Sequence, residues 1–144
     1  MAFIEKNGRA AWLKQRARDE REEFARVRKL RAELFESVDY TCLCCGIRPV
    51  ESIHEEPPRS IGTVPSRTTS IPCCGSGTTG CHGLMQSKRI VAEPISSDQY
   101  LVHLTRFGAR HRMVQFADGE RAYWSFTPTH PRARAHLQGE EVAN

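Results

Sequence analysis

Six cysteines between positions 42 and 81 constrain this chain more than any other feature of its sequence. The first residues, MAFIEKNGRA, hold neither an apolar core nor the cleavage pattern of a secretory signal, so we expect a reducing, cytoplasmic compartment. Thiols stay reduced there, and clustered cysteine pairs are then more often zinc ligands than disulfides. The cluster therefore predicts a structural zinc site.

The spacing indicates which cysteines share the metal. Cys42 and Cys45 form a C-x-x-C pair, and Gly46 after them allows the tight turn that a zinc knuckle needs. Cys74 and Cys81 bracket a turn rich in glycine and threonine. One zinc ion bound by these four residues is the simplest assignment, and free core thiols are the alternative.

Cys44 and Cys73 are left outside this set, although either could substitute for its neighbour. The C-x-x-C spacing favours Cys45 over Cys44, and Cys73 follows a proline and can simply pack. The chain has 144 residues and a hydrophobic fraction of 39%, so its core is modest. A structural metal can add about 10 kcal/mol of folding free energy to such a core.

Residues 1–38 are predicted to form one basic amphipathic helix. From about Gly8 to Glu36 the sequence has no proline and many strong helix formers. An apolar stripe at three- and four-residue steps predicts that the second half packs on the domain; it comprises Phe24, Val27, Leu30 and Leu34. The first half is richer in basic residues, including Arg16 and Arg18. A solvated face with ion pairs and a face that contacts phosphates are both open.

Residues 93–128 show the two-residue alternation of strands. The runs QYLVHLTRF, HRMVQFA and RAYWSFT predict a three-stranded antiparallel meander, with a hairpin turn at Asp118-Gly119. Ala122, Trp124 and Phe126 should face the core, and a base-stacking platform is the alternative role for the aromatic residues. Residues 129–144 are predicted to be a flexible tail.

The middle of the chain, 39–92, carries the polar motifs. A C-x-x-C-G is followed by SIHEEPPRS, then by a short apolar run that ends in cysteine, then by GSGTTGCHG. From Cys42 to Arg89 this order resembles the zinc-stapled branch of the HNH endonuclease family, found in phages and bacteria. The resemblance implies an α+β fold whose central ββα-metal core, also called a His-Me finger, is held by a zinc knuckle. It also implies a second divalent cation that serves DNA cleavage.

The resemblance assigns roles to individual residues. Counted back from Arg59, His54 stands in the family's metal-ligand position and Glu55 in the position of its general-base histidine. Thr69 stands where the family has a central asparagine, and His82 matches the histidine after the last cysteine. A further family histidine is replaced by Gln86, so the motif is degenerate.

A second register is also open. If the extra proline in EEPPRS is an insertion, His54 becomes the base, and Ser52 or Glu51 has to reach the metal. In either register, His54 and His82, helped by Glu55 or Glu56, offer nitrogen and oxygen ligands for Mg²⁺, Mn²⁺ or Ni²⁺. A neutral histidine is a good base near pH 7, whereas a glutamate is a poor one unless burial raises its pKa.

Phosphate contacts are expected from Arg59, whose guanidinium can bind two phosphate oxygens, and from Lys88 and Arg89. The four remaining histidines lie outside the motif and receive no functional role; they are His103, His111, His130 and His136.

Two functions follow as hypotheses. The first is a metal-dependent HNH endonuclease, encoded by a phage or its host, that hydrolyses phosphodiester bonds in duplex DNA. The second is a zinc-stapled nucleic-acid-binding or assembly module that has lost cleavage. The net charge of +4 permits a polyanionic partner. No apolar run reaches membrane-spanning length, so no membrane partner is expected. Dimerisation through the N-terminal helix is open.

Overall fold

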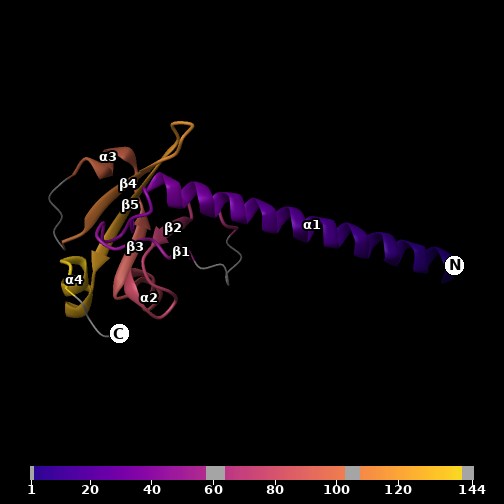
Figure 1. Cartoon of the computed structure of the whole chain (residues 1–144), viewed down its shortest axis with the longest axis horizontal. Helices are drawn as coiled ribbons and strands as arrows, with labels where there is room; N and C mark the ends of the chain where they lie inside the picture. The colour runs from indigo at the N-terminus through magenta and orange to yellow at the C-terminus, as the bar shows by residue number, and fades with distance from the viewer. Residues whose placement is uncertain (1, 58–63, 103–107, 141–144) are drawn as a thin grey trace. The chain divides into compact units, whose positions relative to one another are not determined.

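The computed structural model describes residues 2–57, 64–102 and 108–140, with side chains from residue 8 onward. Its described residues form a mixed α+β structure with one long N-terminal helix and two small antiparallel sheets (Figure 1). The chain divides into a helical unit, Met1–Leu30, and a second unit, Arg31–Asn144, which contains both sheets. No helix in the described part of the chain combines the length and apolar character needed to cross a membrane.

Helix α1 spans Ala2–Ser37, which confirms the helix predicted within residues 1–38. In the first unit its side chains pair along the helix surface: Arg16 bonds Glu20 at 3.3 Å and lies over the Trp12 ring. The predicted apolar stripe is interrupted, because Phe24 is 65% exposed under the guanidinium of Arg28. Leu34, in the second unit, is 1% exposed and belongs to the core.

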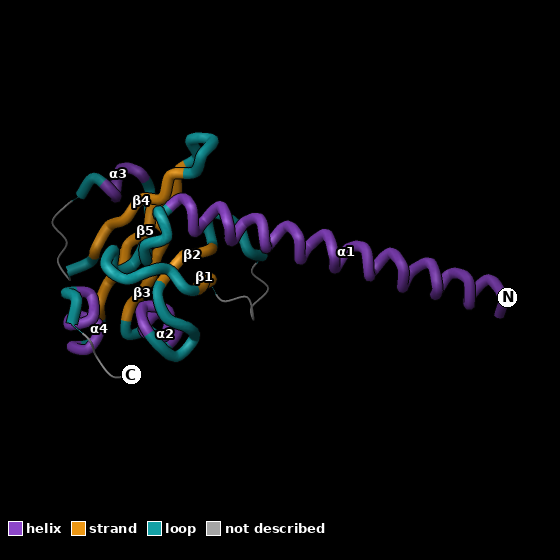
Figure 2. The backbone as a smooth tube through the Cα atoms, viewed as in Figure 1, coloured by secondary structure: helices purple, strands orange, loops and turns teal. Residues whose placement is uncertain are grey.

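The first sheet consists of β1 (Ser52–Glu55) and β2 (Ser70–Cys73), which are antiparallel with His54 opposite Ile71. Helix α2 (Gly80–Gln86) follows and packs against β1 (Figure 2). The loop between β2 and α2 needs its first glycine. Gly75 has a φ of +79°, and a Cβ atom there would collide with the carbonyl oxygen of Thr79.

The second sheet has the strand order β3-β5-β4, from Ile90–Pro94, Arg121–Pro128 and Arg110–Gln115. Two of the three predicted strands are thus present, as β4 and β5, with the predicted turn at Asp118-Gly119 between them. The meander order was wrong, because β5 lies in the centre and pairs with both neighbours. Trp124 and Phe126 are at most 1% exposed, which confirms the predicted core face.

The segment QYLVHLTRF, predicted as the first strand, does not form a strand in the part that the structure describes. Ser97–Tyr100 form the short helix α3, and residues 103–107 lie outside the described residues. The physical reason is a capping box, in which the Ser96 side chain accepts from the Gln99 backbone N–H and the Gln99 side chain accepts from that of Ser96. The strand that takes its place is β3, whose apolar stretch is too short to show clear alternation.

The prediction of a flexible tail was wrong for residues 131–137. They form helix α4 (Pro131–Leu137), whose N-cap is His130 and whose first residue is proline. The His130 side chain accepts a hydrogen bond from the Arg132 backbone N–H at 3.1 Å. Proline at the first position and buried Ala133 and Leu137, four residues apart, are ordinary signals of a short packed helix.

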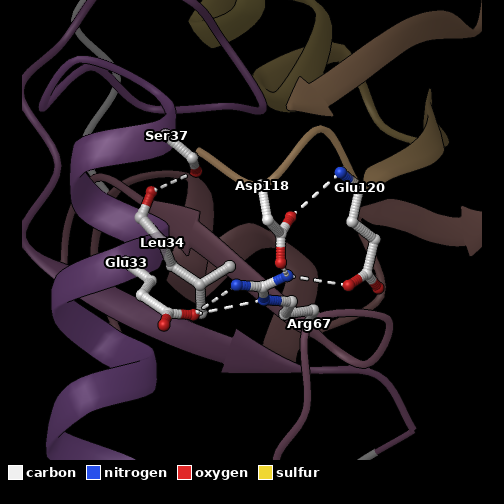
Figure 3. A network of polar contacts seen from close by, with 6 residues as sticks. All are labelled: Glu33, Leu34, Ser37, Arg67, Asp118 and Glu120. Atoms are coloured by element: carbon white, nitrogen blue, oxygen red, sulfur yellow. Dashed lines mark hydrogen bonds and ion pairs between the residues drawn. The ribbon is translucent and has the colours of Figure 1, made fainter. Parts of the chain in front are cut away.

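One arginine joins three segments of the second unit (Figure 3). The Arg67 guanidinium lies 3.0 Å from a carboxylate oxygen of Glu33 at the end of α1. It also lies 2.7 Å from the carboxylates of both Asp118 and Glu120 in the β4–β5 hairpin, and it stacks over the Phe116 ring at 4.3 Å. Arg67 therefore ties the loop before β2 to the helix end and to the hairpin.

Candidate metal centre and histidine site

Four buried cysteine side chains meet beside the first sheet. The sulfur atoms of Cys42, Cys45, Cys74 and Cys81 all lie within 4.8 Å of one another. In a tetrahedral zinc site with Zn–S bonds of about 2.3 Å, neighbouring sulfurs are about 3.8 Å apart. The cluster fits that donor set, so these four residues, which the spacing predicted, could hold a structural metal such as zinc.

Backbone geometry orients the cluster. The Cys45 N–H points at the Cys42 sulfur at 3.5 Å, and the Cys81 N–H points at the Cys74 sulfur at 3.3 Å. Gly46, with a φ of +68°, closes the first turn by donating to the Cys42 carbonyl at 2.9 Å. The cluster thereby joins the loop before β1, the end of β2 and helix α2.

The protonation of the cluster suits a cation. Contact with the Cys42 sulfur lowers the pKa of Cys45 well below that of an ordinary thiol. The pKa of Cys42 is itself lowered to about 7, since its contact with Cys45 raises it and the contacts with the other two sulfurs lower it by more. Contact with Cys42 raises the pKa of Cys74 and Cys81. Close contact among the sulfurs thus favours thiolate at the C-x-x-C pair, and the thiolate is the form of cysteine that binds metals.

The other two cysteines behave as core residues. Cys44 and Cys73 are fully buried, and burial raises the pKa of each thiol. The Cys73 S–H donates to the Ser52 carbonyl within its own sheet at 3.7 Å.

A histidine that the sequence did not indicate contacts the cluster. His136 of α4 is 5% exposed, and its Nε2 lies 3.2 Å from the Cys81 sulfur and 3.9 Å from the Cys74 sulfur. Burial lowers the pKa of His136, and the nearby Arg48 lowers it further. The sequence analysis gave His136 no role, and the structure places it in contact with the sulfur cluster. It follows Cys81 by 55 positions and belongs to no spacing motif, so no sequence signal marked it.

The two predicted histidines of the motif do meet. His54 on β1 and His82 on α2 have ring centroids 5.4 Å apart, with the rings inclined at 75°. His54 is 2% exposed. Two strands and a helix thus bring these rings together beside the sulfur cluster.

Hydrogen bonds fix the free nitrogen of His82. The Ser52 hydroxyl donates its one proton to the Gly75 carbonyl at 2.7 Å, so at its 2.6 Å contact with His82 Nδ1 it must accept. The proton of the neutral ring is therefore on Nδ1 and the lone pair on Nε2. Burial lowers the pKa of His82, and His54 lowers it further, which favours this neutral form.

A carboxylate orients His54 in the same way. Its Nε2 lies 2.9 Å from an oxygen of the Glu56 carboxylate. An ionised carboxylate can only accept a hydrogen bond, so this nitrogen carries a proton. The other nitrogen, Nδ1, is buried and has no hydrogen-bond partner among the described residues. Lys88 contacts the second Glu56 oxygen at 3.1 Å and balances its charge.

The remaining predicted site residues lie in different settings. Glu55 pairs with Ser70, on the face of β1 opposite to His54. The Thr69 hydroxyl accepts from the Ser66 N–H at 3.0 Å and so closes a turn. The Arg89 carbonyl accepts a hydrogen bond from the Thr129 N–H at 2.8 Å. In the first unit, the Arg18 side chain donates to the Gln15 side chain at 2.8 Å. Arg59 lies outside the described residues.

Comparison with known proteins does not assign this chain to a family. No protein-family model, curated protein or solved structure matches this chain. The chemistry of the site therefore has to carry any functional conclusion.

Proposed function

We propose that this protein is a metal-dependent endonuclease of the HNH type, which hydrolyses phosphodiester bonds in DNA and carries a structural zinc ion on its four cysteines. The observation that carries the proposal is the pairing of His54 and His82 from two strands and a helix, with ring centroids 5.4 Å apart. His54 is buried and each ring is held by a polar partner, His54 by Glu56 and His82 by Ser52.

The hydrogen bonds leave each histidine with one nitrogen for chemistry. His82 presents its Nε2 lone pair, and His54 has the buried, unpartnered Nδ1. Two imidazole nitrogens suit Mn²⁺, Ni²⁺ or Zn²⁺, and with water ligands Mg²⁺. A divalent cation there would supply Lewis-acid stabilisation of the charge that develops on the phosphate.

Glu56 determines what His54 can do. By accepting from Nε2–H, its carboxylate keeps the basic lone pair of His54 at Nδ1. That nitrogen can bind the cation or accept a proton from the attacking water, the two roles that the alternative motif registers assign to His54. Glu55 and Glu56 were both candidates for assisting the histidines, and we assign this role to Glu56, which orients His54.

In the proposed enzyme the sulfur cluster positions the helix that carries His82. It connects the end of β2 to α2, the helix that carries His82 one position after Cys81. A small core cannot hold a strand and a short helix in register to a fraction of an ångström by apolar packing alone. Zinc on the four cysteines would hold His82 in place opposite His54.

A second function has two specific observations in its favour. The Glu56 carboxylate, which also pairs with Lys88, satisfies His54 Nε2, and Thr69 is engaged in a turn where the family has its asparagine. A module that binds DNA without cutting it fits these contacts. In either function Arg16, Arg18, Arg59, Lys88 and Arg89 are the proposed phosphate contacts, and binding should weaken with salt.

The deciding experiment is nicking of supercoiled plasmid by zinc-loaded protein with EDTA, Mg²⁺, Mn²⁺ or Ni²⁺. The wild type is compared with His54→Ala, His82→Ala and the control His130→Ala, which removes a histidine far from the pair in sequence. Metal-dependent relaxation that both site variants lose and the control keeps would establish the nuclease. A folded wild type that carries one zinc ion per chain and retains DNA but never cuts it would establish the binding module.

A further inference from the structure

The C-terminal helix α4 touches the sulfur cluster, and no part of the proposed nuclease chemistry uses this contact. His136 reaches the Cys81 sulfur with its Nε2 at 3.2 Å. Arg48, three positions after Cys45, holds the end of the same helix. Its guanidinium donates to the His136 carbonyl at 3.0 Å and to the Glu140 carbonyl at 2.9 Å.

The hydrogen bonds to the four sulfurs follow a pattern. Backbone N–H groups serve three of them: that of Cys45 donates to Cys42, that of Arg48 to Cys45, and that of Cys81 to Cys74. The Cys81 sulfur receives side-chain contacts instead, from the imidazole of His136 and from the Cys44 thiol. Four thiolates around one divalent cation leave a net charge of −2, and such donors reduce the cost of burying it.

The direction of the contact follows from the chemistry of a bound thiolate. A thiolate on a metal can only accept, so His136 Nε2 must carry the proton when the site is loaded. The Arg48 guanidinium, whose Nη1 lies 3.2 Å from the same nitrogen, is also only a donor. When Nε2 is protonated, the Arg48 guanidinium donates to the carbonyls of His136 and Glu140 instead, which are its shortest contacts in the structure.

We propose that His136 is a positioning residue of the metal centre. It donates from Nε2 to the Cys81 thiolate, and through it the docking of helix α4 and the binding of the metal depend on each other. The inference rests on the structural metal of the proposed function, and it is independent of whether the protein cuts DNA.

The test measures zinc affinity of the full chain by competition with a chromophoric chelator. His136→Ala should lose affinity by about tenfold or more, the usual effect of removing a hydrogen bond to a metal ligand. His136→Gln keeps an N–H donor and should recover most of that loss. The matched control is His130→Ala, which weakens the N-cap of the same helix but removes no contact with sulfur.

A second readout follows the helix itself. Hydrogen exchange of the zinc-loaded proteins should show faster exchange of the α4 amides in His136→Ala than in the wild type. The β4–β5 hairpin, which the Arg67 network holds, should exchange at an unchanged rate. The amides of α4 should keep their wild-type protection in His136→Gln.

The outcomes separate this inference from the proposed function. A wild type that binds zinc tightly, with equal affinity in His136→Ala, would overturn the inference alone. Equal losses in His136→Ala and His130→Ala would also overturn it, because helix stability would then explain the effect. Failure of the wild type to bind zinc would remove the structural metal from both proposals. A nuclease that cuts normally while His136→Ala keeps its zinc would leave the proposed function intact.

Discussion

Replacing Cys45 by serine removes one of the four sulfurs and should release both the metal and the constraint that it places on the chain. The structure shows what that constraint joins: the loop before β1, the end of β2 and helix α2. Cys45 and Cys74 are 29 positions apart, so a metal on both closes a long loop. Because the site does not exist in the unfolded chain, the metal binds only the folded protein, and its binding free energy is part of the folding free energy.

The magnitude can be worked from the loop length. The chain-entropy relation used for cross-links gives about 12 cal/mol/K for closing a loop of this size, a cost of about 3.6 kcal/mol at 25 °C, which the metal–sulfur bonds offset in the folded protein. A variant without the metal still has to close the loop but has lost those bonds, so we expect the free energy of unfolding to fall by about 4 kcal/mol or more. Domains of this size are commonly stable by about 5–15 kcal/mol, so the variant should be close to unfolding at 37 °C.

Urea unfolding followed by circular dichroism, together with zinc content by mass spectrometry, measures both effects. Cys73→Ala is the matched control, because Cys73 is an equally buried cysteine outside the set of four, and its thiol donates to the Ser52 carbonyl. It should keep its zinc and lose only about 1 kcal/mol, the cost of a small cavity. A Cys45→Ser protein that retains zinc and the wild-type unfolding midpoint would refute the reasoning.

Three further predictions concern the scaffold. Gly75→Ala should lower the thermal midpoint through its collision with Thr79, whereas Gly77→Ala, with open space around it, should not; equal midpoints would contradict the steric argument. Arg67→Ala should lower the midpoint more in low salt than in high salt, and a salt-independent loss would point to packing over Phe116 instead. The Arg67 side chain lowers the pKa of Asp118 below 3.8, so this carboxylate stabilises the fold above that pH and its contribution is lost as the pH falls through the lowered value. Asp118→Asn should therefore flatten the acid limb of the stability curve, and an unchanged limb would exclude Asp118 as its source.

Local signals predicted the local structure correctly. The many helix formers before Glu36, with no proline among them, predicted α1. The Asp118-Gly119 pair predicted the turn between β4 and β5. The C-x-x-C pair with its glycine predicted the knuckle. Each depends on residues a few positions apart, whose contacts are set by backbone geometry and are therefore visible in spacing.

Two of the errors in the predicted fold have local causes, and a third does not. The capping box at Ser96 and Gln99 starts a short helix where alternation suggested a strand, and the proline after His130 starts another where the composition suggested a flexible tail. Both caps could have been read from the sequence. The central place of β5 could not, because strand order depends on which hydrophobic faces meet.

The sequence by itself determined the four cysteines, the two histidines of the motif and most of the elements that carry them. Only the tertiary structure decided that Glu56 holds His54, that Ser52 leaves the lone pair of His82 on Nε2, and that His136 contacts Cys81. These contacts join side chains whose approach depends on how strands and helices pack. Packing depends on the summed burial of many residues, and no spacing rule encodes that sum for a single pair.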